Sequence, residues 1–335
     1  MLRRAPIVLL SEEAKKAKVL LMDGGMGEEL FLRGLPDDRK TWSSQALLNP
    51  VHHSLVKQIH KDMILSGSCM ITTNNFAVVR ATFKEGGDKV VAELTSIAGQ
   101  LAVEARNETK FKDSVRILGS LPPLNGCYRP DLVLPPEQCH VQYEVILKAL
   151  LPYVDGIICE TLSSTSEMLA AVSAVLAQPE AVELPLLASW SVGRNGKLRS
   201  GEDVNGAISK LLSLAGGRIE AIMFNCGLLE DVYEALLSIT EETRAALKRH
   251  GVVLGAYPNR LTAVPENWTM ESTPDAQPLR EEVTEMVFVE WCIKYYKAGC
   301  TYLGGCCGIY ASYIRALRNE FLDLLPSPFK EMKGS

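Results

Sequence analysis

The chain has 335 residues, of which 47% are hydrophobic and 22% are charged, and its formal net charge at pH 7 is −5. This acidic balance argues against a general attraction to nucleic acid or to an anionic membrane surface. No apolar run reaches the roughly 18 residues that a membrane-spanning helix requires. The length allows one large barrel domain or two ordinary domains.

The cysteine content indicates a reducing compartment. Nine cysteines are an odd number, and several of them lie inside apolar segments. This usage is typical of free thiols and not of a disulfide framework. The N-terminal apolar stretch is shorter than a secretory core and leads directly into Ser11-Glu12-Glu13. We therefore expect a cytoplasmic protein in which residues 1–17 form an N-terminal extension.

Eight apolar runs of strand length recur along the chain, and each is followed by a helical pattern. The runs are continuous and do not alternate with polar residues, as expected for parallel strands that are covered on both faces. They span residues 19–22, 68–73, 115–120, 156–161, 185–190, 221–226, 252–257 and 301–303. Apolar residues at helical spacing predict helices at residues 50–65, 88–107, 137–151, 167–177, 203–214, 229–249, 280–297 and 311–325.

Eight strand–helix units predict an α/β fold, a single-domain (β/α)8 TIM barrel over residues 18–325, followed by a C-terminal tail at 326–335. A doubly wound open sheet produces the same alternation and is the alternative fold. The chain has no Gly-x-Gly-x-x-Gly motif after the first predicted strand, which favours the barrel. Segments 123–136 and 258–279 are long for barrel loops and follow strands, so each is a candidate lid over the active-site face.

Several chemically useful side chains stand at the ends of the predicted strands. In a parallel barrel these ends meet at one mouth, where the active sites of such barrels lie. The pattern therefore predicts that seven residues converge there: Asp23, Thr73, Glu160, Cys226, Tyr257, Cys306 and Cys307.

The adjacent cysteines 306 and 307 follow Gly304-Gly305, which permit a sharp bend. Neighbouring cysteines are poorly placed to form a disulfide with each other. Both can instead turn toward one metal ion, and Cys226 is the best candidate for a third thiolate. Three thiolates would leave the fourth position of a zinc site open. Inert buried thiols are the alternative interpretation.

Four motifs together resemble the zinc-dependent homocysteine S-methyltransferases. They are Asp-Gly-Gly-Met-Gly at 23–27, Glu-Thr-Leu at 160–162, Asn-Cys-Gly at 225–227 and Gly-Gly-Cys-Cys-Gly at 304–308. Their order and approximate spacing are similar to that family from about residue 18 to residue 324. The resemblance implies a (β/α)8 barrel and an enzyme of methionine biosynthesis that methylates the thiol of L-homocysteine.

The resemblance also assigns roles to particular residues. It implies that zinc is the cofactor and that its ligands are Cys226, Cys306 and Cys307, with the homocysteine sulfur at the open position. It implies substrate binding at Asp23, Gly24, Gly25, Thr73 and Glu160, where the two carboxylates would hold the ammonium group. No side chain is then needed as a catalytic acid or base, because the metal activates the substrate thiol.

The methyl donor has two interpretations. The motif at 160–162 and the segment Ala-Tyr-Pro-Asn at 256–259 look more like family members that use a sulfonium, S-methylmethionine or S-adenosylmethionine. Betaine is the alternative. Because aromatic faces attract onium cations, we expect the donor pocket to include Trp42, Phe76 and Tyr257.

A second class of function is a non-enzymatic zinc or thiol-redox barrel, with Cys306 and Cys307 as a thiol switch. This interpretation explains the cysteines, but it does not explain the carboxylates of Asp23 and Glu160 at other strand ends. The expected partners of the enzyme are small molecules, homocysteine and a methyl donor, with no nucleic acid and no membrane. The sequence does not indicate an oligomeric state.

Overall fold

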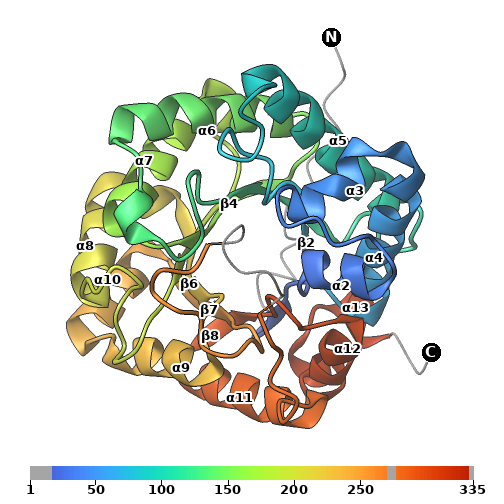
Figure 1. Ribbon diagram of the computed structural model, residues 1–335. Helices are drawn as coiled ribbons and strands as arrows, with labels where there is room; N and C mark the ends of the chain where they lie inside the picture. Colours follow the sequence, from blue (N-terminus) through green and yellow to red (C-terminus); the bar gives the residue numbers. More distant parts are fainter. Residues whose placement is uncertain (1–16, 270–276, 332–335) are drawn as a thin grey trace.

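The computed structural model describes residues 17–269 and 277–331 (Figure 1). The expected N-terminal extension, residues 1–17, lies outside the described residues except for Ala17. Part of the candidate lid at 258–279 also lies outside them. Among the described helices, none combines the length and apolar character needed to cross a membrane.

All eight predicted strands are present and form one parallel sheet in the order β1-β8-β7-β6-β5-β4-β3-β2. The strands are β1 (Leu20–Leu21), β2 (Met70–Thr72), β3 (Arg116–Leu121), β4 (Gly156–Leu162), β5 (Leu186–Ser191), β6 (Ile219–Asn225), β7 (Val253–Tyr257) and β8 (Cys300–Leu303). Between the two end strands, the Cys69 N–H donates to the Leu21 carbonyl at 2.7 Å. The sheet is therefore a nearly closed barrel, and the open-sheet alternative is wrong.

Helices surround the strands on the outside of the barrel (Figure 1). Every residue of β3, β4 and β5 is buried, because one face of each strand meets the barrel interior and the other meets helices. This double coverage is the physical cause of the continuous apolar runs. The outer helices include α4 (His53–Ser66), α5 (Gly87–Asn107), α6 (Pro136–Leu150), α7 (Thr165–Leu176), α8 (Val204–Ala215), α11 (Glu285–Lys297) and α12 (Ala311–Glu320).

The helix predicted at 229–249 is instead two helices, α9 (Leu229–Ser238) and α10 (Glu241–His250). The Ile239 backbone is extended, and the Thr240 side chain accepts a hydrogen bond from the Thr243 N–H as the N-cap of the second helix. Because a threonine cap satisfies a free backbone donor, it starts a new helix at low cost. A further helix, α2 (Met26–Leu32), directly after the first strand was not predicted.

A polar network fills the barrel interior at the N-terminal ends of the strands. The Arg116 guanidinium donates to both carboxylate oxygens of Glu220, at 2.6 and 3.1 Å, and the Tyr302 hydroxyl donates to the same carboxylate. A buried guanidinium requires such a paired partner, since an isolated buried charge is strongly destabilising. This end of the barrel is thus closed by structural side chains, and the opposite end carries the cavity.

Residues 327–330 of the predicted C-terminal tail contact the rest of the protein. The short helix α13 (Ser327–Lys330) places the Phe329 ring against the Phe111 ring, with centroids 5.3 Å apart and planes inclined by 13°. Phe329 is buried.

Candidate active site

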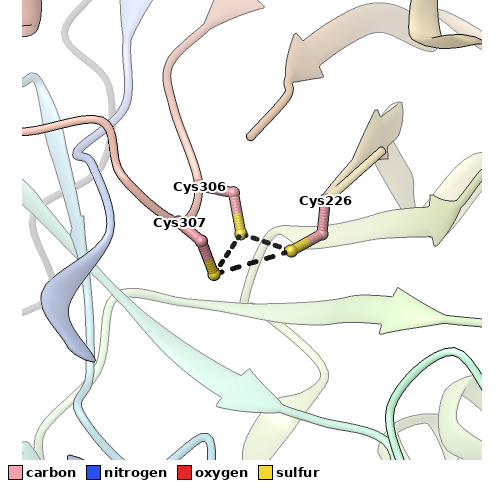
Figure 2. Close-up of side chains that lie close together, drawn as sticks. All are labelled: Cys226, Cys306 and Cys307. Carbon is pink, nitrogen blue, oxygen red and sulfur yellow. Dashed lines mark hydrogen bonds between the residues drawn. The ribbon is translucent and has the colours of Figure 1, made fainter. Parts of the chain in front are cut away.

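Three cysteine sulfurs meet at the C-terminal ends of β6 and β8 (Figure 2). Cys226 Sγ lies 2.8 Å from Cys306 Sγ and 4.0 Å from Cys307 Sγ, and the two neighbouring cysteines are also 4.0 Å apart between sulfurs. Figure 2 shows the three side chains pointing toward one another. The predicted convergence of two distant segments is therefore confirmed.

The donor set fits a zinc ion with one open position. Tetrahedral zinc with Zn–S bonds of about 2.3 Å places thiolate sulfurs about 3.8 Å apart. Two of the three separations in the cluster are close to this value, and only Cys226 and Cys306 would have to move apart. Soft thiolate ligands suit zinc and exclude hard cations such as magnesium or calcium. Hydrogen bonds from Cys306 and then Cys307 hold the pKa of the Cys226 thiol well below its usual value.

Backbone hydrogen bonds between loops fix the paired cysteines. The Gly305 N–H donates to the Asp23 carbonyl at 3.0 Å, and the Cys306 N–H donates to the Pro258 carbonyl at 2.8 Å. A Cβ at Gly25 would lie 2.6 Å from the Cys306 carbonyl oxygen. The glycines after the first strand are therefore needed for the close approach of this loop to the cysteine loop.

Both Thr161 and Cys226 adopt the left-handed backbone conformation, with φ of 60° and 48°. Such strain in residues other than glycine often occurs at functional sites, where neighbouring contacts maintain it. Here Asn225 provides the contacts. Its Oδ1 accepts from the Thr161 N–H at 3.1 Å and from the Ser189 hydroxyl at 2.8 Å, and its Nδ2 donates to Thr161 Oγ1 at 2.7 Å.

Two buried carboxyl groups face the same cavity. Asp23 accepts hydrogen bonds from the backbone N–H and the hydroxyl of Thr72, at 2.7 and 3.3 Å. Glu160 accepts one from the Ser120 hydroxyl. Burial raises the pKa of Asp23 to about 7 and that of Glu160 to about 8, and among the described residues no cationic side chain counteracts either shift. A bound cation between these groups would supply the missing counter-charge.

Thr73 and Gly25 are engaged within the protein. The Thr73 hydroxyl donates to Asn75 Oδ1 at 2.6 Å and accepts from the Ser120 N–H at 3.1 Å. The Gly25 N–H donates to the Ile309 carbonyl at 2.9 Å. Thr73 therefore fixes the end of β2 against β3. The Gly25 backbone joins the loop after β1 to Ile309, which follows the paired cysteines.

All the residues that the sequence indicated for the metal, the substrate and the donor line one cavity at the barrel mouth. Trp42 and Phe76 pack edge to face, with ring centroids 6.0 Å apart, and Trp42 lies directly against Gly27. Tyr257 is buried at the end of β7. The predicted residues are Asp23, Gly24, Gly25, Trp42, Thr73, Phe76, Glu160, Cys226, Tyr257, Cys306 and Cys307.

The cavity also has lining residues to which the sequence assigned no role: Glu28, Arg39, Cys127, Tyr128 and Trp268. Tyr128 and Trp268 belong to the two long segments, whose length was the signal in the sequence. Their rings meet edge to face at 5.7 Å between centroids, so both segments reach the mouth. Glu28 follows the glycine motif directly, but nothing in its spacing distinguished it from an ordinary acidic residue in the first turn of a helix.

The family model for homocysteine S-methyltransferase matches residues 20–321. This chain belongs to the homocysteine S-methyltransferase family of enzymes. The resemblance seen in its four motifs is thereby confirmed across nearly the whole barrel.

Several relatives place the chain within this family. The homocysteine S-methyltransferase of Escherichia coli is 26% identical, over 90% of this chain and 95% of that protein. The betaine–homocysteine S-methyltransferase 1 of Danio rerio is 24% identical, over 92% of this chain and 74% of that protein. Homocysteine S-methyltransferase 2 of Zea mays is 23% identical, over 93% and 91%.

The crystal structure of the homocysteine methyltransferase MmuM from Escherichia coli, in its metallated form, has the same fold. The TM-score is 0.72 at 23% identity, and the superposition covers 91% of this chain and 97% of that one. This likeness confirms the single-domain (β/α)8 barrel.

Proposed function

We propose that the protein transfers a methyl group from a sulfonium donor to the sulfur of L-homocysteine, giving methionine, and that it requires zinc. One observation carries the proposal: three cysteine sulfurs and two buried carboxyl groups line the same cavity. The cluster suits a metal with one open position, and the carboxylates suit the ammonium group of an amino acid. Family membership supports the acceptor.

The site residues have separable roles in this proposal. Cys226, Cys306 and Cys307 would hold the zinc ion, which keeps a coordinated substrate thiol deprotonated at neutral pH. Asp23 and Glu160 bind the homocysteine ammonium and thereby orient its sulfur toward the cysteine cluster. Their burial strengthens this attraction, because few water molecules compete for the charges.

The methyl transfer is a single displacement. The homocysteine sulfur, as a thiolate, forms a bond to the methyl carbon while the bond from that carbon to the donor sulfur breaks. The electron pair of the broken bond stays on the donor sulfur, which leaves as a neutral thioether, and the thiol proton is released to solvent. The aromatic rings of Trp42, which is half-buried, and Tyr257, which is buried, line the cavity and attract the donor cation without acting as nucleophiles.

Two charged residues favour an amino-acid sulfonium as donor. Glu28 and Arg39 line the cavity together with Trp42, and they carry opposite charges. The Arg39 guanidinium pairs with Asp37 through Nη2 at 3.1 Å, whereas its buried Nε–H has no acceptor among the described residues. S-methylmethionine and S-adenosylmethionine carry an ammonium and a carboxylate beside the sulfonium, so the ammonium would pair with Glu28 and the carboxylate would accept from the Arg39 Nε–H. Betaine carries a carboxylate but no ammonium with N–H donors, and it is the alternative donor.

We also propose a cytoplasmic location and small-molecule partners. All nine cysteines are free, and several are buried in the barrel wall. A reducing environment keeps such thiols reduced, and a three-thiolate metal site depends on it. The proposed barrel domain covers residues 18–325.

The direct test is an assay of methionine formation from homocysteine by zinc-loaded protein, with S-methylmethionine, S-adenosylmethionine and betaine supplied separately. We expect turnover with a sulfonium donor, and we expect a chelator to abolish it. Turnover with betaine alone would support homocysteine as the methyl acceptor but would contradict the proposal that the donor is a sulfonium. Absence of turnover with all three, at full zinc content, would favour the thiol-redox barrel.

A further inference from the structure

One cysteine of the cluster has hydrogen-bond partners that the other two lack. The Tyr128 hydroxyl lies 2.8 Å from Cys226 Sγ, and Asn259 Nδ2 lies 3.9 Å from the same sulfur. In the part of the chain that the structure describes, Cys306 and Cys307 have side-chain hydrogen bonds only within the cluster. Tyr128 is only 6% exposed, so water does not compete strongly for its hydroxyl.

The position of Tyr128 is held from outside its own segment. Its backbone is left-handed, with φ of 61°, which is uncommon for an aromatic residue and requires support. The Arg199 Nε–H donates to the Tyr128 carbonyl at 3.3 Å, and the guanidinium lies over the phenol ring at 5.8 Å from its centroid. The Trp268 ring packs edge to face with the phenol ring.

Arg199 also joins the two long segments at the mouth. Its Nη2 donates to the carbonyls of Val264 and Pro265, at 2.9 and 2.8 Å, in the segment after β7. A guanidinium offers several N–H donors in a fixed plane, so one side chain can bind both segments. Through this residue the placement of the Tyr128 hydroxyl depends on the segments that follow β3, β5 and β7.

A hydrogen bond to a metal-bound thiolate withdraws electron density from the sulfur and orients it, and such outer contacts affect metal affinity. We propose that Tyr128 is a positioning residue of the metal centre: its hydroxyl donates to the Cys226 sulfur, and Arg199 couples this bond to the two segments over the mouth. The inference rests on the proposed zinc site. It makes Cys226 the weakest electron donor of the three thiolates.

The test replaces zinc by Co²⁺, whose thiolate-to-metal charge-transfer absorption reports the electron density on the sulfurs. In Tyr128→Phe only the hydroxyl is removed. We expect the variant to bind cobalt and its charge-transfer band to move to longer wavelength, because an electron-richer thiolate gives up an electron more readily. We expect its zinc affinity to fall about tenfold, because the Cys226 sulfur loses the hydrogen bond that orients it.

Tyr143→Phe is the matched control. The Tyr143 hydroxyl is also buried and donates to the Pro122 carbonyl at 3.0 Å, but it does not line the cavity. This variant should retain the wild-type cobalt spectrum. Arg199→Gln should move the band in the same direction as Tyr128→Phe, although no hydrogen bond joins Arg199 to a cysteine in the described residues.

The outcomes distinguish an incorrect zinc site from an incorrect role of Tyr128. A wild-type protein that binds neither cobalt nor zinc overturns the proposed function itself. A metal-loaded Tyr128→Phe protein with an unshifted band overturns the role of Tyr128 and leaves the proposed function intact. If Tyr128→Phe does not retain the metal, Arg199→Gln decides, and an unshifted band there overturns the coupling.

Discussion

Glu160 and Cys226 lie at the ends of different strands, and one side chain links the backbone beside each of them. Asn225, which precedes Cys226, hydrogen-bonds both the N–H and the hydroxyl of Thr161, which follows Glu160. The proposed substrate-binding carboxylate and the proposed metal ligand are therefore held in register by the same amide. The left-handed conformations of Thr161 and Cys226 are consistent with this constraint.

Asn225→Ala should damage both parts of the site at once. It leaves the buried Thr161 N–H and the Ser189 hydroxyl without their acceptor, and an unsatisfied buried polar group costs about 1–3 kcal/mol. We expect lower stability to urea together with weaker zinc and homocysteine binding. Asn107→Ala, at an exposed amide at the C-terminal end of α5, is the control. Loss of stability with normal zinc and homocysteine affinity would show that Asn225 does not position the site.

Cys307→Ala should abolish zinc retention and methyl transfer while the barrel remains folded. Removing one of three thiolates leaves too few ligands for a stable site, whereas the barrel core does not depend on this partly exposed side chain. Zinc content by atomic emission and far-UV circular dichroism measure the two effects. Cys300→Ala, in the buried start of β8, should keep both metal and activity. Normal zinc content in Cys307→Ala would exclude it as a ligand.

Glu160→Gln should weaken homocysteine binding and leave zinc content unchanged. The substitution keeps the size of the side chain but removes the charge that attracts the ammonium. A hydrogen bond to a charged group contributes about 1.5–3 kcal/mol, so the dissociation constant should rise about 10- to 150-fold in calorimetric titration. Glu167→Gln is the control, since Glu167 is also a buried carboxyl but does not line the cavity. An equal loss in both variants would indicate a general effect of burial.

Homocysteine binding should release protons near neutral pH. Burial raises the pKa of Asp23 to about 7 and that of Glu160 to about 8, so both groups are partly protonated before the substrate arrives. A bound ammonium favours the ionised forms and lowers both pKa values. Affinity should therefore fall as the pH decreases from 8 to 6. Titration calorimetry in two buffers of different ionisation enthalpy measures the released protons, and Asp23→Asn should reduce their number.

The same pKa shifts affect stability in the absence of substrate. The folded state binds protons at Asp23 and Glu160 more tightly than the unfolded state, whose carboxyl pKa values are about 4. Because the folded state then holds more protons, this contribution to the free energy of unfolding decreases as the pH rises from about 4 to about 8. Asp23→Asn should flatten that slope in urea denaturation of the zinc-free protein. An unchanged slope would contradict the pKa shift of Asp23.

Glu28→Gln should impair use of the donor and not of the acceptor. If the Glu28 carboxylate binds the ammonium of an amino-acid sulfonium, the KM for S-methylmethionine should rise about tenfold or more, as expected for a lost hydrogen bond to a charged group. The dissociation constant of homocysteine should not change. Glu137→Gln, an exposed first-turn acid of α6, is the control. A normal KM for every donor would show that Glu28 does not bind the donor.

The sequence by itself determined the barrel and the place of its chemistry. Strands covered on both faces need apolar side chains on both, so each strand appears in the sequence as a continuous apolar run. Eight such runs, each followed by a helical pattern, therefore predict the barrel without any knowledge of contacts. Parallel strands bring their C-terminal ends to one mouth, and this geometry placed Asp23, Glu160 and the three cysteines together before any contact was known.

Only the tertiary structure decided which side chains support that site. The Tyr128 hydroxyl beside the Cys226 sulfur and the Asn225 amide on Thr161 depend on left-handed backbone at particular residues, which no periodic pattern reveals. Glu28 lies in the first turn of α2 and Arg39 in the irregular segment after that helix, and no periodic pattern marks either residue as part of the cavity. Such contacts join segments that are far apart in the chain, and their geometry depends on how the loops pack together once the barrel has closed.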